Sequence, residues 1–87
     1  MEIQIGQVVT SRAGRDVGGF YVVAAIESER LLLVNGLKWP LASPKRKNIR
    51  HINPTTTALP GFEAATDETL RAALAAYAEE HGPGKGG

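Results

Sequence analysis

Four positively charged side chains fall within six residues of the sequence, Lys45, Arg46, Lys47 and Arg50, and His51 follows them directly. Like charges this close together repel one another, and a polyanion bound beside them would offset that repulsion. The phosphates of a nucleic acid form such a polyanion, and their neutralisation releases condensed counterions. A solvated surface loop is the alternative explanation for any short basic run. We therefore treat residues 45–51 as a candidate phosphate-binding segment.

A second candidate is the glycine-containing segment that begins at Arg12. Arg12 and Arg15 flank Gly14, and a guanidinium group can bind a phosphate through two hydrogen bonds because it is a planar fork. Gly14 and Gly18 would allow positive φ and a close approach of the backbone to a ligand. Asp16 offers the alternative of a local ion pair with Arg15, which would contribute little. We expect this segment to be a loop that contacts phosphate.

The sequence offers little for catalysis or metal binding. It contains no cysteine, which excludes a disulfide, a thiolate nucleophile and a cysteine-based zinc site. His51 has no second histidine nearby with which to share a metal. There is no phosphate-binding loop ending in Gly-Lys-Ser/Thr, and no pair of acidic residues that the strand pattern would bring into a pocket. We expect no enzymatic activity and no cofactor.

Length and composition predict one small domain. The chain has 87 residues, of which 43% are hydrophobic, enough for one modest core, so its function should lie on the surface. No run approaches the roughly 18 apolar residues of a membrane span, and no basic start with an apolar stretch opens the chain. These features and the lack of cysteine favour the cytoplasm.

The elements that must position the basic residues are predicted to be short strands. Turn residues lie close together between Gly6 and Asn53, and the segments between them are rich in β-branched and aromatic residues. Asn35-Gly36 predicts a type I′ turn that pairs Leu33-Val34 with residues 37–41. About five antiparallel strands would curl into a small barrel. The other strand segments are Gln7–Ser11, Phe20–Ile26, Leu31–Val34 and Asn48–Ile52.

After the predicted barrel of residues 1–54, the composition predicts a connector and then a helix. The connector covers residues 55–65, the helix 66–81 with Thr66 as its cap, and a flexible tail 82–87. Leu70, Leu74 and Tyr77 mark one apolar stripe, which we expect to pack on the barrel or on a partner. Residues 1–53 hold eight Lys/Arg against four Asp/Glu, and residues 54–87 hold two against five. We therefore expect the acidic helix not to carry a nucleic-acid site.

The segment from Gly6 to Ile26, with Gly14 at its centre and Gly18 in the loop, resembles the KOW motif of ribosomal and transcription-associated proteins. Asn35-Gly36, the 44–51 segment and the helix start at Thr66 are similar to a group of small bacterial KOW-domain RNA-binding proteins related to large-subunit ribosomal proteins. The resemblance covers about residues 5 to 77. It implies an SH3-like barrel followed by a helix, and binding of ribosomal RNA or of the large ribosomal subunit without enzymatic activity.

Two functions follow as alternatives. The first is ribosomal-RNA binding through a basic face. The second is docking of a peptide or a translation or transcription partner through Trp39 or the helix. Trp39 itself has two explanations, stacking on an unpaired base or plugging one end of the barrel, whereas Tyr21 is expected in the core. The complete set of candidate RNA contacts is Arg12, Gly14, Arg15, Gly18, Lys38, Trp39, Lys45, Arg46, Lys47, Arg50 and His51.

Overall fold

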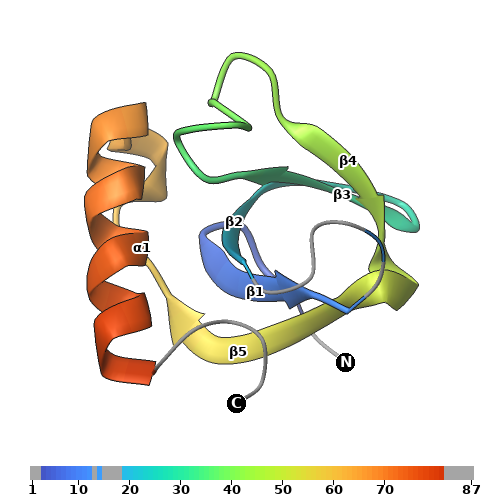
Figure 1. The fold of residues 1–87 in the computed structure, drawn as a ribbon. Helices are drawn as coiled ribbons and strands as arrows, with labels where there is room; N and C mark the ends of the chain where they lie inside the picture. Colours follow the sequence, from blue (N-terminus) through green and yellow to red (C-terminus); the bar gives the residue numbers. More distant parts are fainter. Residues whose placement is uncertain (1–2, 13, 15–18, 82–87) are drawn as a thin grey trace.

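The protein is a curled five-stranded antiparallel sheet with one helix packed against it (Figure 1). The structure is a computed structural model that describes residues 3–12, 14 and 19–81. The strand order is β4-β3-β2-β1-β5, which confirms the predicted small SH3-like barrel with an appended helix. No helix in the described part of the chain is long and apolar enough to cross a membrane. The elements are β1 (Gln7–Ser11), β2 (Phe20–Glu27), β3 (Arg30–Val34), β4 (Lys45–Asn48), the 3₁₀ turn η2 (Ile49–His51), β5 (Ile52–Ala58), the 3₁₀ turn η3 (Phe62–Ala64) and α1 (Asp67–His81).

Both faces of the central strands are buried. One face carries the inner cluster, which lies inside the curl of the sheet, and the other carries the outer cluster, which α1 covers. Neighbouring valines in β1 and β2 divide between the two faces because successive side chains of a strand point in opposite directions. The inner cluster is Val9, Tyr21, Val23, Leu31, Leu33, Trp39 and Ile52. The outer cluster is Val8, Val22, Val34, Leu70 and Leu74.

The predicted hairpin at Asn35-Gly36 is wrong. The Asn35 side-chain oxygen accepts hydrogen bonds from the backbone N–H groups of Leu37 and Trp39, at 2.9 and 3.0 Å. The backbone N–H groups of Asn35 and Gly36 both donate to the Trp39 carbonyl, at 2.9 and 3.2 Å. These bonds close a compact loop, and residues 37–41 form no strand. Strand β3 pairs with β4 instead.

The chain between residues 45 and 58 also differs from the prediction. The expected strand Asn48–Ile52 is interrupted by η2, where the Asn48 side chain accepts a 2.9 Å hydrogen bond from the Arg50 backbone N–H. Strand β5 then continues through Ala58, so the first four residues of the expected connector belong to the sheet. Thr55 helps to bind β5 to β1, because its hydroxyl donates to the Val8 carbonyl at 2.7 Å.

The helix has the bounds and the packing that the sequence predicts. Thr66 precedes it, and its hydroxyl accepts a 3.1 Å hydrogen bond from the backbone N–H of Thr69, as an N-cap does. Leu70 and Leu74 are buried, and Tyr77 packs beside them on the outer cluster. The expected flexible tail, residues 82–87, lies outside the described residues.

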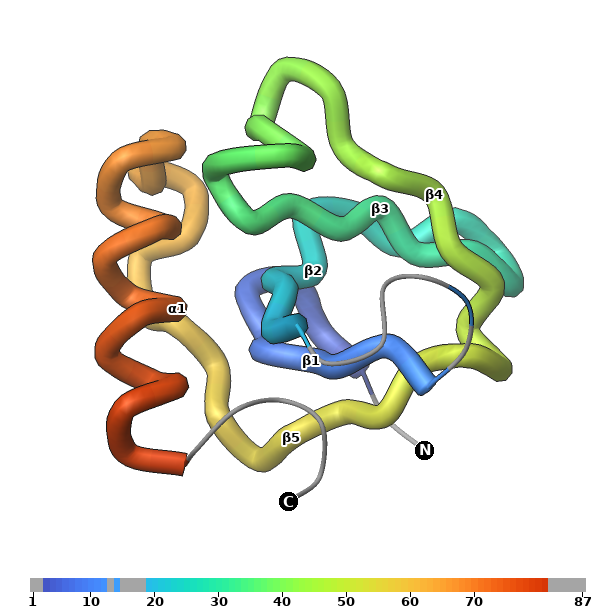
Figure 2. Tube along the Cα trace, in the orientation of Figure 1, coloured from blue at the N-terminus to red at the C-terminus, as the bar shows by residue number. Residues whose placement is uncertain are grey.

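Polar contacts fix α1 to the loop after β3. The Asp67 carboxylate accepts a 2.8 Å hydrogen bond from the Leu41 backbone N–H, and the Arg71 guanidinium donates to the Gly36 carbonyl at 2.7 Å. Figure 2 shows this loop approaching the amino-terminal turns of α1. Because the helix also covers Val8, Val22 and Val34, a chain cut after Pro60 would expose that face of the sheet. The helix is part of the folded core.

Candidate nucleic-acid interface

The basic strand β4 lies at an edge of the sheet and divides its charges between two faces. Lys47 pairs with Leu31 and Lys45 with Leu33, and residues directly opposite one another share a face. Because both leucines belong to the inner cluster, the two lysines lie at the margin of that cluster. Their aliphatic stems can cover apolar surface while the ammonium groups reach solvent.

Arg46 lies on the opposite face of β4. It pairs with Leu32, and its Nε donates a 3.1 Å hydrogen bond to Oε1 of Glu27 in β2. The two side chains are 58% and 47% exposed, so the pair contributes little to stability. It does, however, occupy Arg46 with a carboxylate. The alternation of side chains along a strand is enough to separate Arg46 from the two lysines. To identify Glu27 as its partner, the pairing register of the strands is also needed.

Gly14 lies beside the face of β4 that carries Lys45 and Lys47. A Cβ atom placed on Gly14 would be 3.6 Å from Nζ of Lys47, and Gly14 has the expected positive φ, +78°. The Arg12 backbone N–H donates a 2.8 Å hydrogen bond to the His51 carbonyl. Two segments that are more than 30 residues apart in the sequence therefore meet here. Arg12, Arg50 and His51 are all exposed.

Three other candidates have different outcomes. Arg15 and Gly18 lie outside the described residues. Lys38 is exposed, but it belongs to the loop that contacts α1 through Gly36 and Leu41. The structure thus groups Lys45 and Lys47 of β4 with η2 and Gly14. It places Arg46 on the other face of β4 and Lys38 on the helix side.

Trp39 is a core residue, which corrects its assignment as an RNA contact. Its exposed fraction is 7%, and its ring lies 4.6 Å from that of Tyr21, centroid to centroid, at an interplanar angle of 30°. The ring therefore has no free face large enough for a base or a docked peptide. Of the two explanations for Trp39, packing in the barrel is the one that the structure supports, and Tyr21 is in the core as expected.

Charge is separated across the molecule. Strand β4 and η2 lie on the side away from α1 (Figure 1), and α1 carries four acidic side chains against one arginine. The helix body would repel phosphate, whereas the opposite side would attract it. Within the described ranges, no three His, Asp or Glu side chains gather to hold a metal ion.

The fold and this basic edge define a small β-barrel binding module, in which the sheet is a scaffold and the function lies on the surface. Members of this class differ in the kind of partner that they bind. Comparison with known sequences narrows it to one family.

No family model matches the chain, but several known proteins are similar to it in sequence. It is 32% identical over 73 residues to large ribosomal subunit protein eL14 of Desulfurococcus amylolyticus, covering 83% of this chain and 76% of that protein. It is 36% identical over 76 residues to the protein of that name from Pyrobaculum aerophilum, covering 85% and 73%. For Staphylothermus marinus the identity is 33% over 75 residues, covering 84% and 77%.

The chain therefore belongs to the family of large ribosomal subunit protein eL14. This result confirms the predicted relation to large-subunit ribosomal proteins. The matched relatives are archaeal, so the bacterial group and the KOW motif itself stay predictions.

Proposed function

We propose that this protein binds ribosomal RNA as a component of, or a factor associated with, the large ribosomal subunit. The names of its relatives support this assignment. The RNA-binding face consists of Lys45 and Lys47 of β4 and the loop that begins at Gly14, and we call it the lysine face. Its other described members are Arg12, Arg50 and His51, and Arg15 and Gly18, which lie outside the described residues, stay candidates from the sequence.

The observation that carries the proposal is the position of Gly14 beside Lys47. A glycine with positive φ exposes its backbone to a ligand, and here an ammonium group lies next to it. Side chains rarely reach base edges in the deep groove of an RNA helix, so a small barrel recognises such a helix through phosphates and 2′-hydroxyl groups. The lysine face suits this mode because it offers cations and an accessible backbone together.

The same assignment implies a structural role. The relatives are named as constituents of the ribosome, which supports a protein without enzymatic activity that works in the cytoplasm together with ribosomes. Peptide docking through Trp39 is not favoured, since the ring is buried.

The test compares two neighbouring cations of β4. Lys47→Ala removes a charge from the lysine face, whereas Arg46→Ala removes one from the opposite face of β4. Each lost phosphate contact should reduce the slope of log affinity against log salt by about 0.7 to 0.9. We therefore expect Lys47→Ala to flatten the slope by about that amount, Lys45→Ala/Lys47→Ala by about twice as much, and Arg46→Ala by much less.

The measurement is binding to a structured fragment of large-subunit ribosomal RNA from 50 to about 300 mM salt, together with cosedimentation with large subunits. Equal slopes for the parent and the double variant would contradict the lysine face as the binding site. Equal losses for Lys47→Ala and Arg46→Ala would show that only net charge matters.

Gly14→Val tests the loop. Its φ of +78° strains any residue with a Cβ, although the nearest atom to that Cβ, Nζ of Lys47, is at an ordinary contact distance. We expect a loss of about 1 to 2 kcal/mol in the free energy of unfolding and a lower affinity for RNA. Gly61→Val is the control, because Gly61 has φ +69° and no atom within 4 Å of its Cβ position. That variant should lose similar stability yet bind RNA as the parent does. Equal RNA affinity in both folded variants would exclude the loop as a contact.

A further inference from the structure

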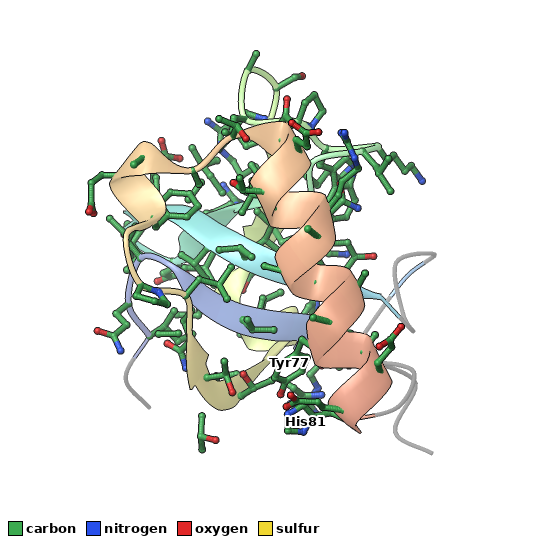
Figure 3. The ribbon with its side chains drawn as sticks, turned by 90° about the vertical axis from the view of Figure 1, so that its left-hand side faces the viewer. Tyr77 and His81 are labelled. Carbon is green, nitrogen blue, oxygen red and sulfur yellow. The ribbon has the colours of Figure 1, made fainter. Side chains whose placement is uncertain are left out.

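A hollow of about 310 Å³ lies between η3 and the amino-terminal half of α1. One wall consists of Leu59, Pro60 and Phe62, and the other of Thr69, Leu70 and Ala73. Figure 3 shows the segment around η3 beside this half of the helix, while the labelled Tyr77 and His81 mark the other half. We call this space the apolar hollow.

The apolar hollow exists because small residues face it. Phe62 and Leu70 both belong to the packing of the outer cluster, but Ala64 and Ala73, which also line the hollow, are too short to fill it. A Cβ atom placed on Gly61, a further lining residue, would have no described atom within 4 Å. Protein interiors are otherwise closely packed. The two elements therefore leave room for a group from another molecule.

The lining of the hollow selects an apolar occupant. Among the described residues that line it, Thr69 alone has a polar side chain, and its hydroxyl donates a 3.0 Å hydrogen bond to the Thr66 carbonyl. Pockets for small molecules usually hold several polar groups that orient the ligand, and their volumes range from about 300 to 1,000 Å³. This hollow has the smallest of those volumes and an apolar lining, which suits one large apolar side chain.

An exposed apolar residue lies close to the same hollow. Ile5 is 55% exposed, and the next residue, Gly6, lies against the wall of the hollow. The Leu59 backbone N–H donates to the Gly6 carbonyl at 2.8 Å, and a Cβ atom placed on Gly6 would be 3.3 Å from Cβ of Phe62. Exposed apolar surface that extends beyond a single side chain is typical of a protein interaction site.

The surface around the apolar hollow is acidic. Glu63 lies in η3 between two lining residues, and Glu68 directly precedes a lining residue of α1; both are exposed. Residues 52–70 contain three acidic residues and no lysine or arginine. The next cation along the chain, Arg71, already donates to the Gly36 carbonyl. This charge attracts a positively charged ligand and repels phosphate.

We propose that the apolar hollow holds one large apolar side chain of a basic protein segment, in which lysines or arginines flank that side chain. The hollow lies beside α1, whereas β4 lies on the side away from α1 (Figure 1). A peptide bound here leaves the lysine face free, so the protein can hold an RNA and a basic protein at once. Peptide docking does not require the proposed RNA binding and is tested separately from it.

The experiment measures binding of fluorescent heptapeptides to the full-length protein by anisotropy. The test peptides have a central leucine, phenylalanine or tryptophan with three basic residues on each side. One comparison peptide has a central alanine, and another keeps a central phenylalanine between glutamates. We expect the best test peptide to bind about tenfold or more tightly than either comparison peptide, because burial of a large apolar side chain contributes at least that factor.

Matched variants test the hollow and its charge. Ala73→Leu fills the hollow with a good helix former and should weaken binding of the best test peptide about tenfold. Ala75→Leu makes the same change at an exposed position that is not among the lining residues, and it should bind as the parent does. Glu63→Gln/Glu68→Gln should weaken binding about two- to fivefold at low salt. Glu29→Gln, at the turn between β2 and β3, should not.

Amide NMR spectra locate the peptide on the protein. The backbone signals of Gly61, Thr69 and Ala73 should shift when the best test peptide is added, and those of β4 should not. Ala73→Leu should bind the ribosomal RNA fragment as the parent does. Circular dichroism of each variant verifies that α1 is intact.

Several results would overturn the inference. Equal affinity for the test peptides and the central-alanine peptide would exclude the hollow, and equal affinity for the glutamate-flanked peptide would exclude a basic partner. Absence of binding to all test peptides up to about 1 mM would exclude both. Equal weakening by Ala73→Leu and Ala75→Leu would show that the peptide binds elsewhere. Loss of RNA binding alone would contradict the proposed function and leave peptide docking in place.

Discussion

Gly36→Ala is expected to lower the free energy of unfolding by about 2 to 5 kcal/mol. Gly36 has φ +78°, and a Cβ at this position would meet the backbone carbonyl of Asp67 and would lie 3.0 Å from Cγ of Arg71. Left-handed strain costs about 1 to 2 kcal/mol, and overpacking against a backbone that cannot yield costs about 1 to 3 kcal/mol more. The helix would have to move away from the loop, which would also break the hydrogen bond from Arg71 to the Gly36 carbonyl.

Gly61→Ala separates the two contributions. Gly61 has a similar φ, +69°, but no atom within 4 Å of its Cβ position, so this variant should show the strain without the clash. Urea unfolding of both proteins measures the difference. Equal destabilisation would mean that α1 does not lie against Gly36 in solution.

Leu70→Ala is expected to cost about 2 to 5 kcal/mol, as large-to-small changes in a core do. Leu70 is 1% exposed and belongs to the outer cluster with Val8, Val22 and Val34. The substitution would leave a cavity between α1 and the sheet. Thermal unfolding followed by circular dichroism at 222 nm and at the tyrosine band would report on helix and barrel together.

Leu37→Ala is the matched control, because Leu37 is 68% exposed and its truncation removes little buried surface. We expect a change of about 0.5 kcal/mol or less. If Leu70→Ala were equally mild, or if the helix melted well before the barrel in the parent, α1 would be an accessory and not part of the core.

Local patterns determined much of this protein. The helix begins where Thr66 indicates, because capping depends on neighbouring residues. The β-branched segments became β1, β2 and β3 because their composition suits a pleated surface buried on both faces. The basic run of residues 45–51 could also be identified from the sequence as a candidate, because it is continuous in the sequence.

Strand pairing was decided by tertiary structure. Asn35-Gly36 suits a two-residue hairpin, but the Asn35 side chain instead binds two backbone N–H groups, and α1 holds the loop through Asp67 and Arg71. The first restraint is local, but the restraint from α1 comes from residues about 30 positions away. No local propensity contains that information, so the sequence pattern selected the wrong partner for β3.

The candidate site shows the same division. The sequence determined which residues could bind phosphate, because that depends on charge and on the conformational freedom of glycine. Only the fold decided that Lys47 meets Gly14, that Arg46 turns to Glu27, and that Trp39 is buried against Tyr21. These outcomes depend on strand register, in which a shift of one residue moves every side chain to the other face. Register is set by the packing of the whole barrel. Composition and spacing could therefore identify the basic residues, but they could not show which of them lie on the same face.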